Sequence, residues 1–215
     1  MCAIIGGDVQ ATEENIGTIC RLFIESRIRG KHATGVSYLK DGIQTIREPI
    51  PAEEFISIHD PSEWVSNGRI KFIAHCRYST SDIRFNQPLG DDILSIVHNG
   101  VVTQDPPEMW GRYGYNMQTS NDSELIWHSA ANDHEPLTEF PDSSMAVAEL
   151  HADGRMLWYR NGKRPLYMSS GFIFSTKDIE VRSGLPDGEM CQPGYVYSEG
   201  ENTKIVEKRE LINVQ

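Results

Sequence analysis

The second residue of the chain, Cys2, has the chemistry of a nucleophile. It stands directly before a short apolar run and a glycine pair in the opening stretch MCAIIGG, where chain ends are usually frayed and polar. Removal of Met1 would leave Cys2 as the first residue, with a thiol and an α-amine on the same carbon skeleton. An ordinary thiol and an ordinary α-amine have pKa values of about 8.5 and about 8. Such a residue is therefore a nucleophile that carries its own base.

A cationic side chain, Arg77, stands in the stretch AHCRYST, which follows the apolar run 70–73. Strand ends are common places for functional groups, so Arg77 is either an exposed strand-end residue or a charged group of a site. Adjacent strand residues point to opposite faces, so we do not expect His75 and Cys76 to share a metal ion.

The stretch VHNGVV, residues 97–102, interrupts an apolar run with Asn99 and Gly100. An Asn-Gly pair is typical of a type I′ hairpin turn. The alternative is an oxyanion hole, in which the Asn carboxamide and the next N–H point at one spot because glycine lets the backbone approach closely. The residues alone leave both interpretations open.

The stretch TSNDSELI, residues 119–126, contains Asn121 and Glu124 at capping-box spacing, which places Asp122 in the first turn of a helix. There Asp122 either complements the helix dipole or holds the cationic group of a ligand. A further stretch, RGKHATG at residues 29–35, has two glycines and indicates a tight loop.

The elements that must position these groups form an antiparallel pattern. Asp-Gly pairs at 41–42 and 153–154 each separate two strand-like runs and are strong hairpin signals. Thr12 is a plausible N-cap, and the apolar spacing after it predicts a helix to about residue 24. Other runs predict strands at 2–6, 70–76, 93–98, 166–169, 172–176, 194–198 and 203–207, and helices near 61–67 and at 122–132. This pattern favours an α+β layered fold.

Composition limits the class of protein. The 215 residues are 39% hydrophobic and 24% charged, with no linker-like stretch, so we expect one domain spanning 1–215. The formal net charge of −11 argues against a nucleic-acid partner. No apolar stretch approaches ~20 residues and no signal sequence opens the chain, so we expect no membrane span and a cytoplasmic location. The four cysteines are widely spaced and are expected to be reduced.

Taken together and in this order, the motifs resemble the class II glutamine amidotransferases, whose glutaminase domain belongs to the N-terminal-nucleophile (Ntn) hydrolases. The shared features are the initial Cys, an R-G-x-x-x-x-G loop, an H-x-R-aromatic-x-T strand end, a Q-P, an H-N-G and a D-S-E. The resemblance is strongest to the glutaminase domain of amidophosphoribosyltransferase, followed by those of glucosamine-6-phosphate synthase and glutamate synthase. The resemblance runs from Cys2 to about residue 176 and implies a four-layer αββα sandwich of two antiparallel sheets flanked by helices.

The resemblance also implies a role for each reacting group. Cys2 would be the nucleophile, and Asn99 and Gly100 would form the oxyanion hole. Arg77 and Asp122 would hold the α-carboxylate and α-amine of the substrate, L-glutamine. The implied reaction needs no metal and no cofactor.

Other positions of the resemblance carry supporting roles. Thr80 would line the glutamine pocket, Arg29 would help to hold the N-terminus, and Tyr78 and His98 would support the site. The stretch 164–166, Arg-Pro-Leu, matches a family stretch to which we assign core strand structure.

The chain departs from the family pattern at three places. His32 stands where the family usually has Asp, Tyr78 replaces a common Trp, and Ser81-Asp82 replaces a frequent His-Gly. These changes affect the shape of the pocket and its lid and leave the reacting groups intact.

The resemblance predicts that ammonia passes to another enzyme. About 40 residues follow residue 176, too few for a synthetase domain, so the ammonia acceptor is expected to be a separate chain. Two alternatives remain: an independent Ntn amidohydrolase acting on a γ-glutamyl or other amide, and a non-catalytic regulatory protein that retains the fold.

Overall fold

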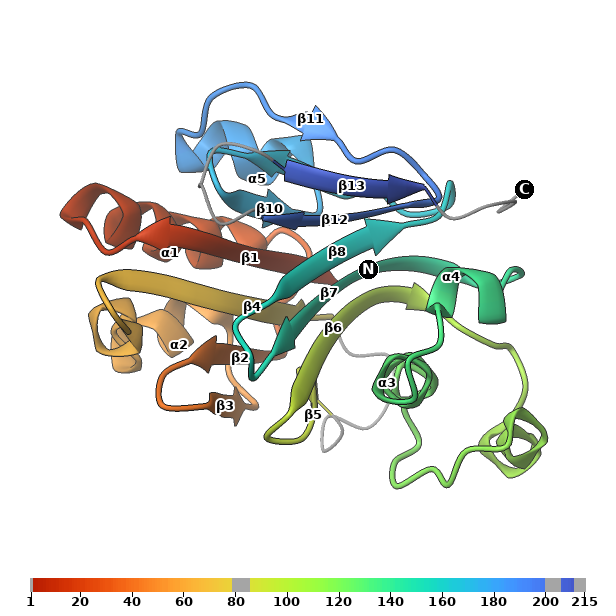
Figure 1. The fold of residues 1–215 in the computed structure, drawn as a ribbon. Coiled ribbons are helices and arrows are strands. Elements are labelled where there is room, and N and C mark those ends of the chain that lie inside the picture. The colour runs from red at the N-terminus through yellow and green to blue at the C-terminus, as the bar shows by residue number, and fades with distance from the viewer. Residues whose placement is uncertain (1, 79–85, 200–205, 211–215) are drawn as a thin grey trace.

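The strands form two antiparallel sheets in the part of the chain that the structure describes (Figure 1). This computed structural model describes residues 2–78, 86–199 and 206–210. The first sheet contains, in spatial order, β11 (Glu189–Met190), β9 (Tyr167–Ser169), β10 (Phe172–Phe174), β1 (Ala3–Gln10), β4 (Arg69–Arg77), β2 (Ala33–Leu39) and β3 (Ile43–Glu48). The second contains β13 (Val206–Glu210), β12 (Tyr195–Glu199), β8 (Met156–Arg160), β7 (Ser144–His151), β6 (Leu94–Val101) and β5 (Leu89–Gly90).

Helices cover the outer face of each sheet (Figure 1). Against the first sheet lie α1 (Glu13–Ser26), α2 (Ala52–Ile58), α5 (Lys177–Ser183) and the 3-10 helix η1 (Pro61–Trp64). Against the second lie α3 (Glu124–Ala131), α4 (Pro136–Glu139) and the 3-10 helix η3 (Pro107–Tyr113).

Buried apolar side chains fill each space between these layers. Phe23 and Phe72 lie between the helices and the first sheet, Ile4 and Val97 between the two sheets, and Leu125 between the second sheet and its helices. The order helix, sheet, sheet, helix within the described ranges confirms the predicted four-layer αββα fold.

Local signals predicted several boundaries correctly. Asp41 and Gly42 join β2 to β3 with φ of 52° and 102°, the left-handed conformations that a type I′ turn requires. Asp153 and Gly154 lie in the turn that joins β7 to β8, where Gly154 has a φ of 91°. Thr12 is the N-cap of α1, and its hydroxyl accepts a hydrogen bond of 3.2 Å from the Asn15 N–H.

Other predicted boundaries were wrong. The helix expected near 61–67 is only the short 3-10 helix η1. Asn67 and Gly68, both with left-handed backbone conformations, then turn the chain into β4. The chain instead forms α2 earlier, at Ala52–Ile58. Elements such as α4, α5, β5, β11 and η3 were not predicted, since segments of two to seven residues are too short to show a period. The expected strand 203–207 overlaps β13, and its residues 203–205 lie outside the described residues.

All four cysteines of the chain lie in the described part and are free thiols, as predicted. Among the described residues, no helix has both the length and the apolar character needed to cross a bilayer.

Candidate active site

The pairing of β1 with β4 places Cys2 near Arg77. In this antiparallel pair Ile4 faces His75, and continuing the register by two residues sets Cys2 opposite Arg77. Facing residues and alternate residues of a strand share one side of a sheet. Ile4 lies in the core between the sheets, so Cys2, His75 and Arg77 belong to that side. Cys76 lies in the core under the helices, which confirms that His75 and Cys76 diverge.

Strand β6 supplies the opposing side. Val97 lies in the core between the sheets, and Ile96 lies in the core under α3. By alternation, Asn99 is on the inter-sheet side of β6, whereas His98 and Gly100 are on the side of α3.

A cavity of about 380 Å³ lies between these strand ends. It brings together most of the site residues predicted from the sequence, namely Cys2, Arg77, Tyr78, His98, Asn99, Gly100 and Asp122. Its other lining residues are His75, Gln87, Val101, Asn121, Ser123 and Arg164. Arg29 is not among them, and Thr80 lies outside the described residues, as do Ser81 and Asp82.

Asn99 and Gly100 are not a hairpin turn. They lie within β6 and pair with Ala146 and Met145 of β7. A Cβ on Gly100 would overlap the carbonyl oxygen of Ser144, so close backbone approach requires glycine here. This removes the turn interpretation that the sequence left open.

Two hydrogen-bond donors of this strand are suited to an anion. Asn99 is 3% exposed, and its Nδ2 has no hydrogen-bond partner among the described residues. The His98 N–H donates to Gln87 Oε1 at 2.6 Å, on the edge of β6 opposite to β7. Strand alternation then directs the Gly100 N–H to that same edge.

A ring of hydrogen bonds fixes His98. Its Nδ1 lies 2.8 Å from the Ser123 hydroxyl, its Nε2 lies 3.2 Å from the Ser144 carbonyl, and Gln87 Nε2 donates to Ser123 Oγ. Because a carbonyl only accepts, Nε2 carries the proton, and the Ser123 hydroxyl donates to Nδ1. Burial lowers the pKa of His98, against the opposing effect of Asp122, so the neutral ring joins β6 to the start of α3.

Asp122 is held by backbone groups of the β6–α3 connection. Its Oδ2 accepts hydrogen bonds from Val102 N at 2.6 Å and Thr103 N at 3.3 Å. The predicted capping box does not form, because Glu124 accepts from the backbone of Gln118 and Thr119. Asp122 precedes α3, and its carboxylate is anchored at the cavity wall.

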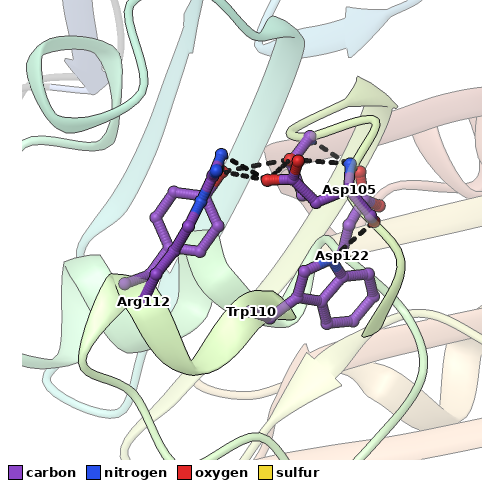
Figure 2. Close-up of polar contacts among 6 residues, drawn as sticks. Asp105, Trp110, Arg112 and Asp122 are labelled. Atoms are coloured by element: carbon purple, nitrogen blue, oxygen red, sulfur yellow. Dashed lines mark hydrogen bonds and ion pairs between the residues drawn. The ribbon is translucent and has the colours of Figure 1, made fainter. Parts of the chain in front are cut away.

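A polar cluster supports this connection (Figure 2). The Thr103 hydroxyl donates to Asp105 Oδ2 at 2.9 Å, and Arg112 forms an ion pair with the same carboxylate. Trp110 Nε1 donates to the Asp105 carbonyl at 2.8 Å. The cluster therefore fixes the segment whose N–H groups bind Asp122.

The two glycines of the RGKHATG stretch do not form the tight loop that the sequence predicted. Gly30 instead allows close backbone packing. A Cβ on Gly30 would overlap the peptide between Cys76 and Arg77, so glycine lets the chain after α1 pass against the end of β4. Gly35 lies within β2 and not in the loop. Arg29 lies just before this contact, and burial lowers its pKa.

Arg164 is the site residue that the sequence interpretation missed. The sequence predicts core strand structure at 164–166, but β9 begins only at Tyr167, and of these three residues Leu166 alone is fully buried between the sheets. Arg164 lines the cavity instead. The local sequence does not separate Arg164 from its neighbour Lys163, which is exposed and lies outside the cavity.

The buried His75 makes stability depend on pH. Burial, with Arg77 and His98 nearby, lowers its pKa to about 3. Below about pH 6.5 the imidazole of His75 takes up a proton in the unfolded chain but not in the folded one. As the pH falls, His75 therefore lowers the free energy of unfolding by up to about 1.4 kcal/mol per pH unit.

We therefore expect His75→Gln to flatten the dependence of unfolding free energy on pH between about pH 6 and pH 4. Urea titrations of both proteins at several pH values measure it. Equal slopes for the two proteins would show that His75 is not held neutral.

No protein-family model matches the chain, and no curated protein matches it. Among solved structures it is similar to the glutamine phosphoribosylpyrophosphate amidotransferase of B. subtilis, with a TM-score of 0.69 and 16% identity over 99% of this chain and 49% of that one. It is also similar to a structure of "the allosteric regulatory enzyme of purine biosynthesis", with a TM-score of 0.72 and 16% identity over 99% of this chain and 50% of that one. The chain thus spans about half the length of these two proteins.

A third similar structure has nearly the same length. It is a glutamine aminotransferase class-II domain protein from Silicibacter pomeroyi, with a TM-score of 0.59 and 11% identity over 98% of this chain and 99% of that one. At these identities the likeness establishes the fold. The resemblance to class II glutamine amidotransferases that the motif order indicated is confirmed at that level.

Proposed function

We propose that this chain is a glutaminase of the class II glutamine amidotransferase type with Cys2 as nucleophile. The observation that carries the proposal is the cavity in which Cys2 meets an arginine, a carboxylate and the unpartnered amide of Asn99. The shared fold adds support, because the similar structures include a glutamine amidotransferase.

The reaction proceeds in two halves. After removal of Met1, the α-amine of Cys2 takes the thiol proton, and the thiolate attacks the side-chain carbonyl carbon of glutamine. The Asn99 amide and the Gly100 N–H stabilise the resulting oxyanion. The amine returns the proton to the leaving nitrogen, the C–N bond breaks, and ammonia departs. Water then attacks the thioester and releases L-glutamate and the thiol.

The cavity selects an amino-acid zwitterion. Arg77 suits the α-carboxylate, since guanidinium and carboxylate pair in a bidentate manner. Asp122 suits the α-ammonium group, and its second oxygen anchors the carboxylate to Val102. The charges of Arg77 and Asp122 in one cavity favour free glutamine over uncharged amides.

We expect Arg77→Ala to raise the KM for L-glutamine at least tenfold, with a smaller effect on kcat, because it removes a substrate contact. Asp122→Asn should act in the same way, since it removes the charge but keeps an acceptor for the Val102 N–H. Steady-state kinetics measure both. A fall in kcat at unchanged KM would place these groups at the reacting centre and not at the α-carbon.

Ammonia released in the cavity would serve an acceptor enzyme on a separate chain. We expect a partner with its acceptor substrate bound to raise the weak glutaminase activity several-fold, and free ammonia to replace both this chain and glutamine in the partner's reaction. Turnover of about 10 per second without a partner would favour an independent amidohydrolase.

Glutamate release from L-glutamine tests the proposal. The purified chain with a processed N-terminus should release equal amounts of L-glutamate and ammonia, and D-glutamine should not react. Faster hydrolysis of γ-glutamyl anilides than of glutamine would favour a γ-glutamyl hydrolase. Absence of hydrolysis and of binding would favour a non-catalytic protein.

A further inference from the structure

Arg164 adds a positive charge to the cavity lining and forms no ion pair with a carboxylate of the described chain. Arg164 lines the cavity together with Cys2, Arg77 and Asp122. Its Nε is buried and has no hydrogen-bond partner among the described residues, and its guanidinium forms no ion pair with them. A buried donor without a partner is costly, which points to a ligand as its partner.

The backbone at Arg164 is held in place. Arg160 Nε donates to the Arg164 carbonyl, and Arg160 Nη1 donates to the Cys191 carbonyl at 2.9 Å. Two residues later Leu166 is fully buried between the sheets. The guanidinium therefore extends from a fixed point on the cavity wall.

Arg164 lines the cavity beside the strand that carries the oxyanion donors, and its charge acts on two neighbouring groups. Burial is the main reason for the lowered pKa of His98, and the charge of Arg164 contributes to it. Arg164 also lies close enough to Arg29 to lower the pKa of that residue, after burial. Asn99, Gly100 and Arg164 line the same cavity, so the charge of Arg164 acts on the region in which the glutamine side chain would react.

The charges of the cavity do not match glutamine alone. Among the described lining residues, Arg77 and Arg164 are cationic and Asp122 is anionic, while burial lowers the pKa of both His75 and His98 and keeps them neutral. A zwitterion satisfies Arg77 and Asp122 and leaves Arg164 unpaired. An amino acid with a second carboxylate satisfies all three.

We propose that Arg164 is a second anion-binding group of this cavity and makes it selective for α-amino dicarboxylates, so that the product L-glutamate binds more tightly than L-glutamine and inhibits the reaction. The inference rests on the proposed function. Hydrolysis replaces a neutral side-chain amide by a carboxylate, and this new charge is the partner of Arg164.

Calorimetric titration of the full chain tests the proposal. The Cys2→Ala variant prevents turnover, so the Kd values of L-glutamate and L-glutamine are measured with and without Arg164→Gln. We expect Arg164→Gln to weaken L-glutamate binding at least tenfold and L-glutamine binding less than threefold. Arg164→Lys should keep part of the preference. Lys163→Gln is the matched control, because Lys163 is exposed and bonds to the Asp142 carbonyl, and it should leave both Kd values unchanged.

Each other outcome contradicts the proposal in a distinct way. Equal losses for both amino acids would place Arg164 at the α-carboxylate, and unchanged binding of both would show that it touches no ligand. If L-glutamine binds but the Kd of L-glutamate is the same with and without Arg164→Gln, this inference fails and the proposed function stands. If neither amino acid binds to the folded Cys2→Ala protein, both fail. Circular dichroism of each variant confirms that it is folded.

Discussion

Cys2→Ala is expected to lower kcat for glutamine hydrolysis by at least about 10⁴-fold, because loss of the nucleophile in a covalent mechanism leaves only binding and oxyanion stabilisation. Binding of L-glutamine should remain, since Arg77 and Asp122 are intact. Rapid-quench assays of glutamate release measure the fall, and calorimetry measures the affinity.

Cys20→Ser is the matched control for this change. Cys20 is half-buried on α1, outside the cavity, so its replacement should leave kcat unchanged. Hydrolysis by Cys2→Ala at the rate of the unchanged protein would exclude Cys2 as the nucleophile.

An uncleaved extension before Met1 separates the thiol from the amine. It keeps Cys2 but converts its α-amine into a peptide nitrogen, so a protein with an N-terminal tag should be inactive and one with a C-terminal tag active. Equal activities would mean that another group takes the thiol proton.

Asn99→Ala is expected to lower kcat about 100-fold, equivalent to roughly 3 kcal/mol, with little change in KM, since the amide acts on charge that develops only in the transition state. Because the buried Nδ2 of Asn99 has no hydrogen-bond partner among the described residues, its removal breaks no such bond of the folded protein. Steady-state kinetics and thermal unfolding of the variant measure activity and stability separately.

Asn161→Ala is a useful comparison for Asn99→Ala. Asn161 is also a buried asparagine, but its amide bonds to the backbone of Ser143 and Met145, so its loss should lower stability more than kcat. If Asn99→Ala left kcat unchanged, the oxyanion role of Asn99 would be wrong.

The layers of the fold were predictable because their signals are local. Asp-Gly turns, the Thr12 cap and period-3.6 spacing each act within a few residues, and they predicted α1 and the β2–β3 and β7–β8 hairpins. The order of the motifs gave the class of fold. Short elements such as α4 and β11 lacked any such period.

The candidate site was predictable at those residues whose type alone suggests chemistry. Cys2, Arg77 and Asp122 belong to this group, and they come together because the ends of β1 and β4 meet the β6–α3 connection at one cavity. Their roles remain predictions until the variants are measured.

Contacts between distant segments were not predictable from the sequence. The ring that joins Gln87, His98 and Ser123 depends on how β6 lies against the start of α3. The position of Arg164 at the cavity depends on the path of the chain from β8 in the second sheet to β9 in the first. Neither leaves a periodic pattern in the sequence, because each involves single residues in loops or strand ends.

Peptide mapping after covalent labelling tests most directly whether Cys2 is the nucleophile. The reagent is a glutamine analogue that carries a diazomethyl ketone in place of the side-chain amide. The account predicts a single adduct on Cys2, on a chain that lacks Met1, and protection of Cys2 by L-glutamine. An adduct on Cys20, Cys76 or Cys191 with Cys2 unmodified would contradict it.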